Sequence, residues 1–144
     1  MSGKELFYVQ IFLIIVLFYF GSTVAIAANP ILFIVFIIAM LLGLFAFYNM
    51  GSKNYSPFPH PRAGAKLVQL GIYKYIRHPM YTSVMLIGLV LFLTSPTFLG
   101  FVTLTLLIGV LYIKANMEEE LLTKMHSQYK DYAAKTKKFI PFVF

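Results

Sequence analysis

The sequence predicts an all-α integral membrane protein, with a bundle of four transmembrane helices followed by a C-terminal cytoplasmic amphipathic helix. Of the 144 residues, 60% are hydrophobic and only 12% are charged, which is far from the average soluble domain. No charged residue lies between Glu5 and Lys53, or between Arg77 and Lys114. Each of these stretches is long enough for two helices that cross a bilayer. We therefore expect a single membrane domain over residues 1–144.

The first charge-free stretch predicts spans over about residues 6–28 and 31–50. Asn29-Pro30 separates them, because proline disrupts a helix interior but fits the first turn of a new helix. Gly43 offers a point of close packing in the second span. Neither span carries an ionisable side chain, so we expect both to act as scaffold or to contact lipid.

Residues 51–78 form a loop, which we expect to bind the cofactor discussed below. Its first half contains three prolines and is bounded by Gly51 and Gly64, a composition that predicts irregular backbone. Such a loop is either a surface connector or a stiff wall over a site. His60 lies between two of the prolines and is interpreted as structural.

The second charge-free stretch predicts a third span over residues 79–94 and a fourth over 98–113, joined by the uncharged turn Ser95-Pro96-Thr97. Pro79 suits the first helical turn, so His78 is the expected N-cap. This helix start offers free N–H groups that could bind an anion; alternatively, Arg77 and His78 only mark the membrane boundary. Basic residues gather in segments 53–77 and 114–138, which predicts a cytoplasmic location for both termini and for the site.

Residues 114–144 form the predicted amphipathic helix and a tail. An apolar stripe runs along one side of this helix and comprises Leu121, Leu122, Met125, Tyr129 and Tyr132. Glu118 faces the stripe, so it needs a partner such as Lys114, Arg77 or a bound ligand. A purely structural ion pair is the alternative. The tail, residues 135–144, is basic and then apolar, and could contact the membrane or cover a cavity.

The other polar residues of this segment are expected at the surface. Glu119 lies about a quarter turn from the stripe and Glu120 roughly opposite it, so both carboxylates are expected to be solvated. Asp131 and His126 are also interpreted as surface residues.

Several kinds of chemistry are excluded by the composition. The chain has no cysteine and three scattered histidines, so we expect no disulfide and no metal site. Nucleotide-binding glycine loops are also absent. The net charge of +7 follows the membrane topology, so we expect contact with membrane lipids and no nucleic acid. Two polar segments that adjoin one helical hairpin remain, and together they suit a polar cofactor beside a lipophilic substrate.

A pattern across these two segments resembles a known family. It reads Gly71-x-Tyr73-x-x-x-Arg77-His78-Pro79-x-Tyr81, followed by an acidic pair, Tyr129-x-x-Tyr132 and Ile140-Pro141. The pattern covers residues 55–141 and is similar to that of the isoprenylcysteine carboxyl methyltransferase and phospholipid methyltransferase superfamily, with residues 56–59 resembling its small prokaryotic members.

The resemblance implies an S-adenosyl-L-methionine-dependent integral membrane methyltransferase. It implies that Arg77 and Glu118 act in catalysis, and that the cofactor is bound by Gly71, Tyr73, His78, Pro79, Tyr81, Glu118, Glu119, Tyr129 and Tyr132. The acidic pair is either Met117-Glu118 or Glu118-Glu119. Lys114 stands where family members use an arginine near the substrate.

The implied acceptor is lipophilic or embedded in the membrane. Prenylated protein ends, phospholipid amines, quinone-like lipids and small hydrophobic thiols or acids all remain open, as does the oligomeric state. One alternative function is a sterol-type reductase that uses NADPH, although Met80-Tyr81-Thr82-Ser83 lacks the asparagine and the acid of that block. A second alternative is a non-enzymatic four-span protein that binds lipid.

Overall fold

The chain folds as a helical membrane protein. The computed structural model describes residues 2–62, 64–141 and 143. Its elements are α1 (Gly3–Phe20), α2 (Thr23–Ala28), α3 (Pro30–Met50), the 3₁₀ turn η1 (Gly71–Lys74), α4 (Pro79–Thr94), α5 (Phe98–Met125) and α6 (Tyr129–Lys135). Helices α1, α3 and α5 are long and apolar enough to cross a membrane, and α4 is a shorter apolar helix. No element in the described residues is a β-strand, as expected.

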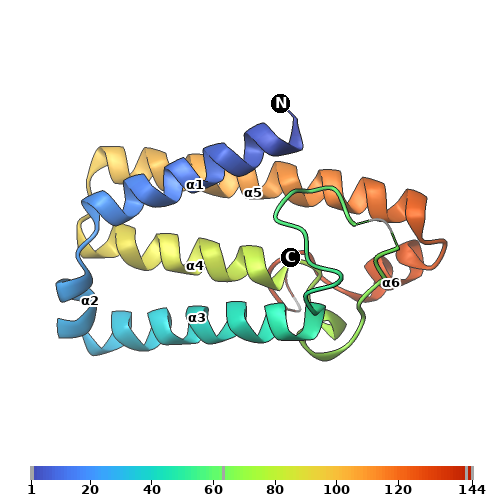
Figure 1. The fold of residues 1–144 in the computed structure, drawn as a ribbon. Helices are drawn as coiled ribbons and strands as arrows, with labels where there is room; N and C mark the ends of the chain where they lie inside the picture. Colours follow the sequence, from blue (N-terminus) through green and yellow to red (C-terminus); the bar gives the residue numbers. More distant parts are fainter. Residues whose placement is uncertain (1, 63, 142, 144) are drawn as a thin grey trace.

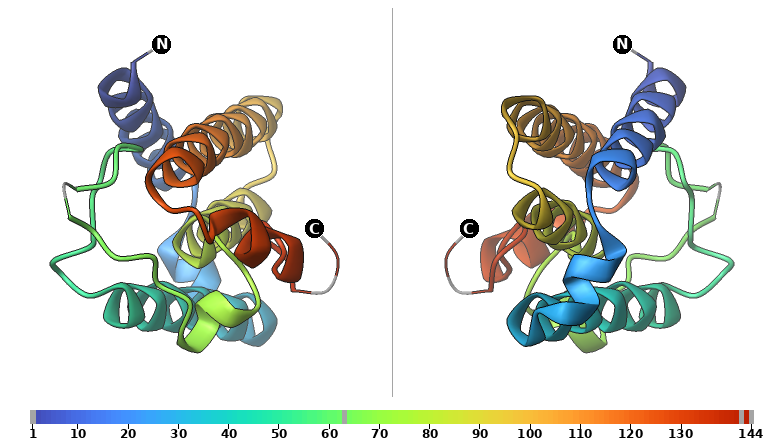
Figure 2. Two further views of the ribbon diagram at one scale, coloured as in Figure 1. Left: turned by 90° about the vertical axis from the view of Figure 1, so that its right-hand side faces the viewer. Right: turned by 90° about the vertical axis from the view of Figure 1, so that its left-hand side faces the viewer.

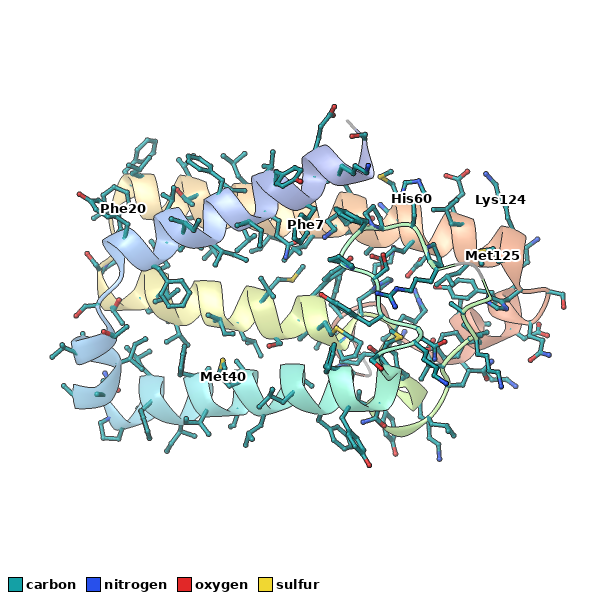
Figure 3. The ribbon with its side chains drawn as sticks, in the orientation of Figure 1. Phe7, Phe20, Met40, His60, Lys124 and Met125 are labelled. Carbon is teal, nitrogen blue, oxygen red and sulfur yellow. The ribbon has the colours of Figure 1, made fainter. Side chains whose placement is uncertain are left out.

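The helices lie side by side, with α4 between α3 and the pair formed by α1 and α5 (Figure 1). The core is aliphatic and comprises Leu13, Leu17, Ile26, Val90, Leu91, Leu104, Leu107 and Leu111. The helices turn their other apolar side chains outward, as expected where lipid is the solvent. Polar atoms gather at the end where His60 and Lys124 lie, whereas the end near Phe20 is mostly carbon (Figure 3).

The first expected span, residues 6–28, is two helices. The chain leaves the helical conformation at Gly21, and the Ser22 side chain accepts a hydrogen bond from Ala25 N at 3.1 Å, which caps α2. Ser22 N also donates to Thr94 Oγ1 at 2.9 Å. Local capping by serine therefore ends the apolar run. Helix α2 then turns the chain from α1 toward α3 (Figure 1).

The seam between α3 and α4 is close, as Gly43 predicts. The Ser83 hydroxyl donates to Ala39 O at 2.6 Å, and a Cβ atom at position 43 would lie 2.6 Å from Ser83 Oγ. Small residues thus let the two backbones approach. Both α3 and α4 begin at the predicted prolines, Pro30 and Pro79.

The expected amphipathic helix is the second half of α5 together with α6. Helix α5 continues through Lys114 without a break and ends at Met125. A short turn then leads into α6, and the tail returns to form a parallel bridge between Lys137 and Ile76. Phe139 is buried, whereas Phe142 and Phe144 of the expected tail lie outside the described residues.

Gly71 is the position where the fold most requires glycine. Its φ is +58°, and a Cβ atom would lie 1.7 Å from Asn49 Oδ1 at the end of α3. We predict that Gly71→Ala lowers the free energy of unfolding by more than the roughly 1–2 kcal/mol that a left-handed conformation alone costs. Thermal unfolding in detergent measures the change.

Two glycines serve as matched controls. Gly64 also has a positive φ, +76°, but a Cβ atom there meets nothing within 4 Å, and Gly109 has open space and no such conformation. We expect Gly64→Ala to show only the conformational cost, and Gly109→Ala to be neutral or stabilising by up to about 1 kcal/mol. Equal effects at positions 71 and 64 would contradict a contact with Asn49.

Candidate functional site

A cavity of about 380 Å³ lies at the polar end of the bundle. It is lined by residues of α1, α3, α4, α5 and α6 and of the loop between α3 and α4. Eight of the residues singled out from the sequence line it, namely Tyr73, Arg77, His78, Pro79, Tyr81, Glu118, Tyr129 and Tyr132. Gly71 and Glu119 are not among the lining residues. The two polar segments therefore meet at one cavity.

The proline-rich loop is one wall of this cavity. It runs from the end of α3 across to the start of α1 and back (Figure 2). Asn54 orders it, because its Nδ2 donates to Met50 O at 3.0 Å and its Oδ1 accepts from Lys66 N at 3.0 Å. Phe58 packs edge-on against Phe7 of α1, with ring centroids 5.3 Å apart. Of the two interpretations of the loop, the wall is the one that this geometry favours.

His78 lies at the start of α4 with both ring nitrogens facing carboxylates. Its side chain makes no capping hydrogen bond, contrary to the N-cap expectation. Instead, Nε2 lies 3.0 Å from Glu119 Oε1, and Nδ1 lies 3.5 Å from Glu118 Oε2. The ring stacks on Tyr81, with centroids 5.5 Å apart and planes 2° apart.

These contacts determine the protonation of His78. Burial lowers the pKa of the imidazole, but the hydrogen bonds and charges of Glu118 and Glu119 outweigh burial and raise this pKa above its usual value. A carboxylate on each side requires an N–H on each ring nitrogen. The ring is therefore an imidazolium held between two anions.

Glu119 is not solvated, which corrects the expectation from the helical wheel. Its side chain is 18% exposed and contacts Arg77 Nε at 2.8 Å and Lys138 Nζ at 3.2 Å. The wheel places Glu119 only relative to its own stripe, whereas these cations come from another helix start and from the tail. Glu120, with a 68% exposed side chain, pairs with Lys124 on the surface as expected.

Glu118 has partners other than Lys114 and Arg77. Its Oε1 accepts a hydrogen bond from the Tyr81 hydroxyl, and its Oε2 faces His78. Arg77 is directed elsewhere: its Nη1 donates to Ala133 O at 3.0 Å and also to Thr136 O. The expectation that Glu118 requires partners is therefore met by different residues.

Lys114 is buried one helical turn from Glu118, on the side toward the apolar core of the bundle. Its Nζ donates to Gln10 Oε1 at 2.6 Å and lies over the rings of Phe7 and Tyr81, 5.5 Å and 5.3 Å from their centroids. The residue is 1% exposed. Sequence reasoning missed Gln10, although an amide within a run of aliphatic and aromatic residues is itself a signal of a buried polar contact.

The tyrosines of the site are neutral at physiological pH. Burial raises the pKa of Tyr73 and Tyr129, and burial raises the pKa of Tyr132 to about 12. The Tyr132 hydroxyl donates to Tyr73 O at 2.7 Å. By contrast, the buried Tyr129 hydroxyl, at the cavity wall, has no hydrogen-bond partner in the described part of the chain. A buried hydroxyl of this kind is suited to a ligand.

The remaining polar residues lie away from the cavity wall. His60 and Asp131 are exposed, and His126 is half-buried. None of the three lines the cavity, and the described residues contain no group of side chains suited to a metal ion.

The fold and the cavity together define a helical integral membrane protein with a ligand site at one end of its bundle. Residues 31–124 match the family model described as isoprenylcysteine carboxyl methyltransferase, and the chain belongs to this family. It is therefore a membrane methyltransferase. A search of curated proteins gave no match. The matched range leaves out α1, α6 and the tail, all of which contact the cavity residues.

The raised pKa of His78 makes stability depend on pH. The stabilisation is fully present below the unfolded pKa of about 6.5 and is lost as pH rises through the higher folded pKa. We predict that the difference in melting temperature between the wild type and His78→Gln is largest near pH 6 and shrinks toward about pH 9. Thermal unfolding across this range measures the difference.

His60→Gln is the control, because His60 is exposed. Its difference from the wild type should stay constant over the same range. A difference for His78→Gln that grows with pH would show that the ring is neutral in the folded protein.

Proposed function

We propose that the chain is an S-adenosyl-L-methionine-dependent methyltransferase that acts on a lipophilic acceptor, with the cofactor in the cavity at the polar end. The observation that carries the proposal is the meeting of an ordered ionic cluster and an unpartnered Tyr129 hydroxyl in one cavity. The family membership supports the methyl transfer.

The donor set fits this cofactor, which carries a carboxylate, an ammonium, a sulfonium and a nucleoside. Glu118 offers a carboxylate to a cationic group, and Arg77 supplies positive field for an anionic one. Tyr129 offers a free hydroxyl, while Tyr73 and Tyr132 supply aromatic walls. His78, Pro79 and Tyr81 line the same wall, whereas Gly71 and Glu119 act indirectly, by shaping η1 and by holding His78.

When bound, the cofactor supplies a methyl group on a positively charged sulfur. The acceptor nucleophile forms a bond to the methyl carbon while the carbon–sulfur bond breaks, and its electron pair stays on sulfur. The chain's part is to align the two groups and exclude water, which the proline-rich wall and the packed tyrosines are placed to do. Where an acceptor carries a proton, Glu118 is the carboxylate placed to take it.

The acceptor approaches from the bilayer in this proposal. The cavity volume of about 380 Å³ is near the low end of the range for a single ligand, roughly 300–1,000 Å³, so a second, lipid-sized molecule has to extend beyond it. Helices α1 and α3 lie on opposite sides of α4 (Figure 2), and both carry apolar lining residues, Phe7 and Phe47. An apolar chain between these helices would stay in lipid.

The same proposal includes the topology. Helices α1, α3, α4 and α5 are the four crossings, and the cavity end, rich in lysine and arginine, lies on the cytoplasmic side with both termini. Residues 1–144 then form one membrane domain, in which the loop over residues 51–78 and the segment after residue 114 hold the cofactor.

The proposal predicts binding of S-adenosylhomocysteine to the purified protein and no binding of NADPH. Glu118→Gln keeps the shape of the side chain but removes its charge, so affinity should fall by at least ~10-fold, the loss expected for one charge-assisted hydrogen bond. Isothermal titration calorimetry in detergent measures both. Glu120→Gln, on the exposed carboxylate two residues along, should bind like the wild type.

Each alternative function has its own result in this experiment. Binding of NADPH with hydride transfer would indicate the sterol-type reductase. Binding of neither cofactor by folded protein would indicate a non-enzymatic lipid-binding protein.

The pair formed by Gln10 and Lys114 yields a separate prediction for the acceptor side. The ammonium lies nearer the bilayer than Glu118 and faces the cavity, so it suits an anionic or carbonyl oxygen on the acceptor. Lys114→Met should lower turnover of hydrophobic acids by at least ~10-fold while S-adenosylhomocysteine affinity changes by less than ~3-fold.

Lys124→Met, at an exposed position of the same helix, is the control and should retain turnover. A loss of cofactor affinity in Lys114→Met that equals the loss of turnover would place the ammonium at the cofactor instead. Methyl transfer to a panel of acids, amines and thiols, measured with labelled cofactor, distinguishes these results.

A further inference from the structure

The tail of the chain is paired with the backbone of the cavity segment. We call residues 136–139 the C-terminal brace. Arg77 N donates to Lys137 O at 2.8 Å, His78 N donates to Lys138 O at 3.0 Å, and Lys137 N donates to Tyr75 O at 3.0 Å. These three bonds fix the backbone immediately before α4, where no helical hydrogen bond is available.

Side chains attach the brace to the same segment. The Thr82 hydroxyl donates to Phe139 O at 2.8 Å, and the Phe139 ring lies 5.8 Å from that of His78. The brace therefore packs behind His78 and does not line the cavity.

Lys138 links the brace to the ionic cluster. Its Nζ lies 3.2 Å from Glu119 Oε2, and its side chain is 14% exposed. The other oxygen of this carboxylate, Oε1, contacts both Arg77 and His78. Each oxygen thus has its own cation or cations, and the rotation of the carboxylate about its terminal bond is fixed.

We propose that Lys138 is a positioning residue for the methyltransferase: acting through Glu119, it fixes the His78 imidazolium and thereby the carboxylate of Glu118 in the cavity. Neither Lys138 nor Glu119 lines the cavity, so neither contacts a ligand there directly. The inference rests on the proposed function for its effect on turnover, but its structural part concerns only the chain itself. Lys138 also lies outside the residues that match the family model.

The removal of the ammonium has a defined consequence. Without Lys138, Oε2 of Glu119 lacks its cation, and the carboxylate is free to turn toward water. His78 Nε2 then loses the fixed acceptor that keeps its proton in place, and the ring no longer holds Glu118 in one orientation. Alignment of the reacting groups suffers more than binding, because small displacements affect the transition state most.

The test compares Lys138→Met, Lys138→Arg and Lys137→Met. Lys137 is the matched control, because its side chain is exposed while its backbone makes the same kind of bonds. We expect Lys138→Met to lower kcat by ~10-fold, with a change in S-adenosylhomocysteine affinity of less than ~3-fold and an unchanged Tm. Lys138→Arg, which keeps the charge, should restore most of kcat, and Lys137→Met should match the wild type.

A second readout does not depend on activity. In protein labelled at histidine nitrogen, the Nε2 proton of His78 should give a slowly exchanging, downfield NMR signal in the wild type, Lys138→Arg and Lys137→Met. The signal should be lost in Lys138→Met. A wild-type protein without methyl transfer would defeat the proposed function alone, because this signal still tests the brace.

Two results would overturn the inference. One is an unchanged His78 signal in Lys138→Met. The other is a loss of kcat in Lys138→Met that is matched by Lys137→Met or accompanied by an equal fall in Tm, since either pattern describes a general structural role.

Discussion

The polar end of this protein depends on one buried cation held between two carboxylates. His78 is 6% exposed and has Glu118 and Glu119 on its two ring nitrogens. Breaking one member of such a group leaves an uncompensated buried charge, which costs far more than the intact group contributes. The start of α4 and the later turns of α5 are therefore held in register, and α5 has to continue beyond the apolar bundle to bring its carboxylates there.

Backbone requirements explain the rest of this end. The residues before α4 lie at a helix start and have no helical partners, so the C-terminal brace supplies acceptors for Arg77 N and His78 N. The tight turn at η1 is possible because Gly71 adopts a positive φ against Asn49. In a chain with so few polar side chains, the backbone groups of two distant segments satisfy one another, and this pairing forms the floor behind the cavity.

Local signals made much of the fold predictable from the sequence. The proline starts of α3 and α4 were predicted because proline acts within one turn of its own position. The break at Gly21-Ser22 was missed because both residues lie within an unbroken apolar run, where a serine cap is outweighed in any average over a window. The contacts of Glu119 and Gln10 could not be predicted, since a helical wheel contains no partner from elsewhere and Gln10 meets Lys114 104 positions away.

The division of the chain between matched and unmatched parts follows from this geometry. Residues 31–124 hold the proline-rich wall, His78 and the carboxylates, which any member of the family needs for the same donor. Helix α1 supplies Gln10 on the bilayer side of Lys114, and the brace supplies Lys138 behind Glu119. Both partners act on a charge located within the matched part, so substitutions in α1 and in the tail can change acceptor contacts and alignment while the charged residues themselves stay the same.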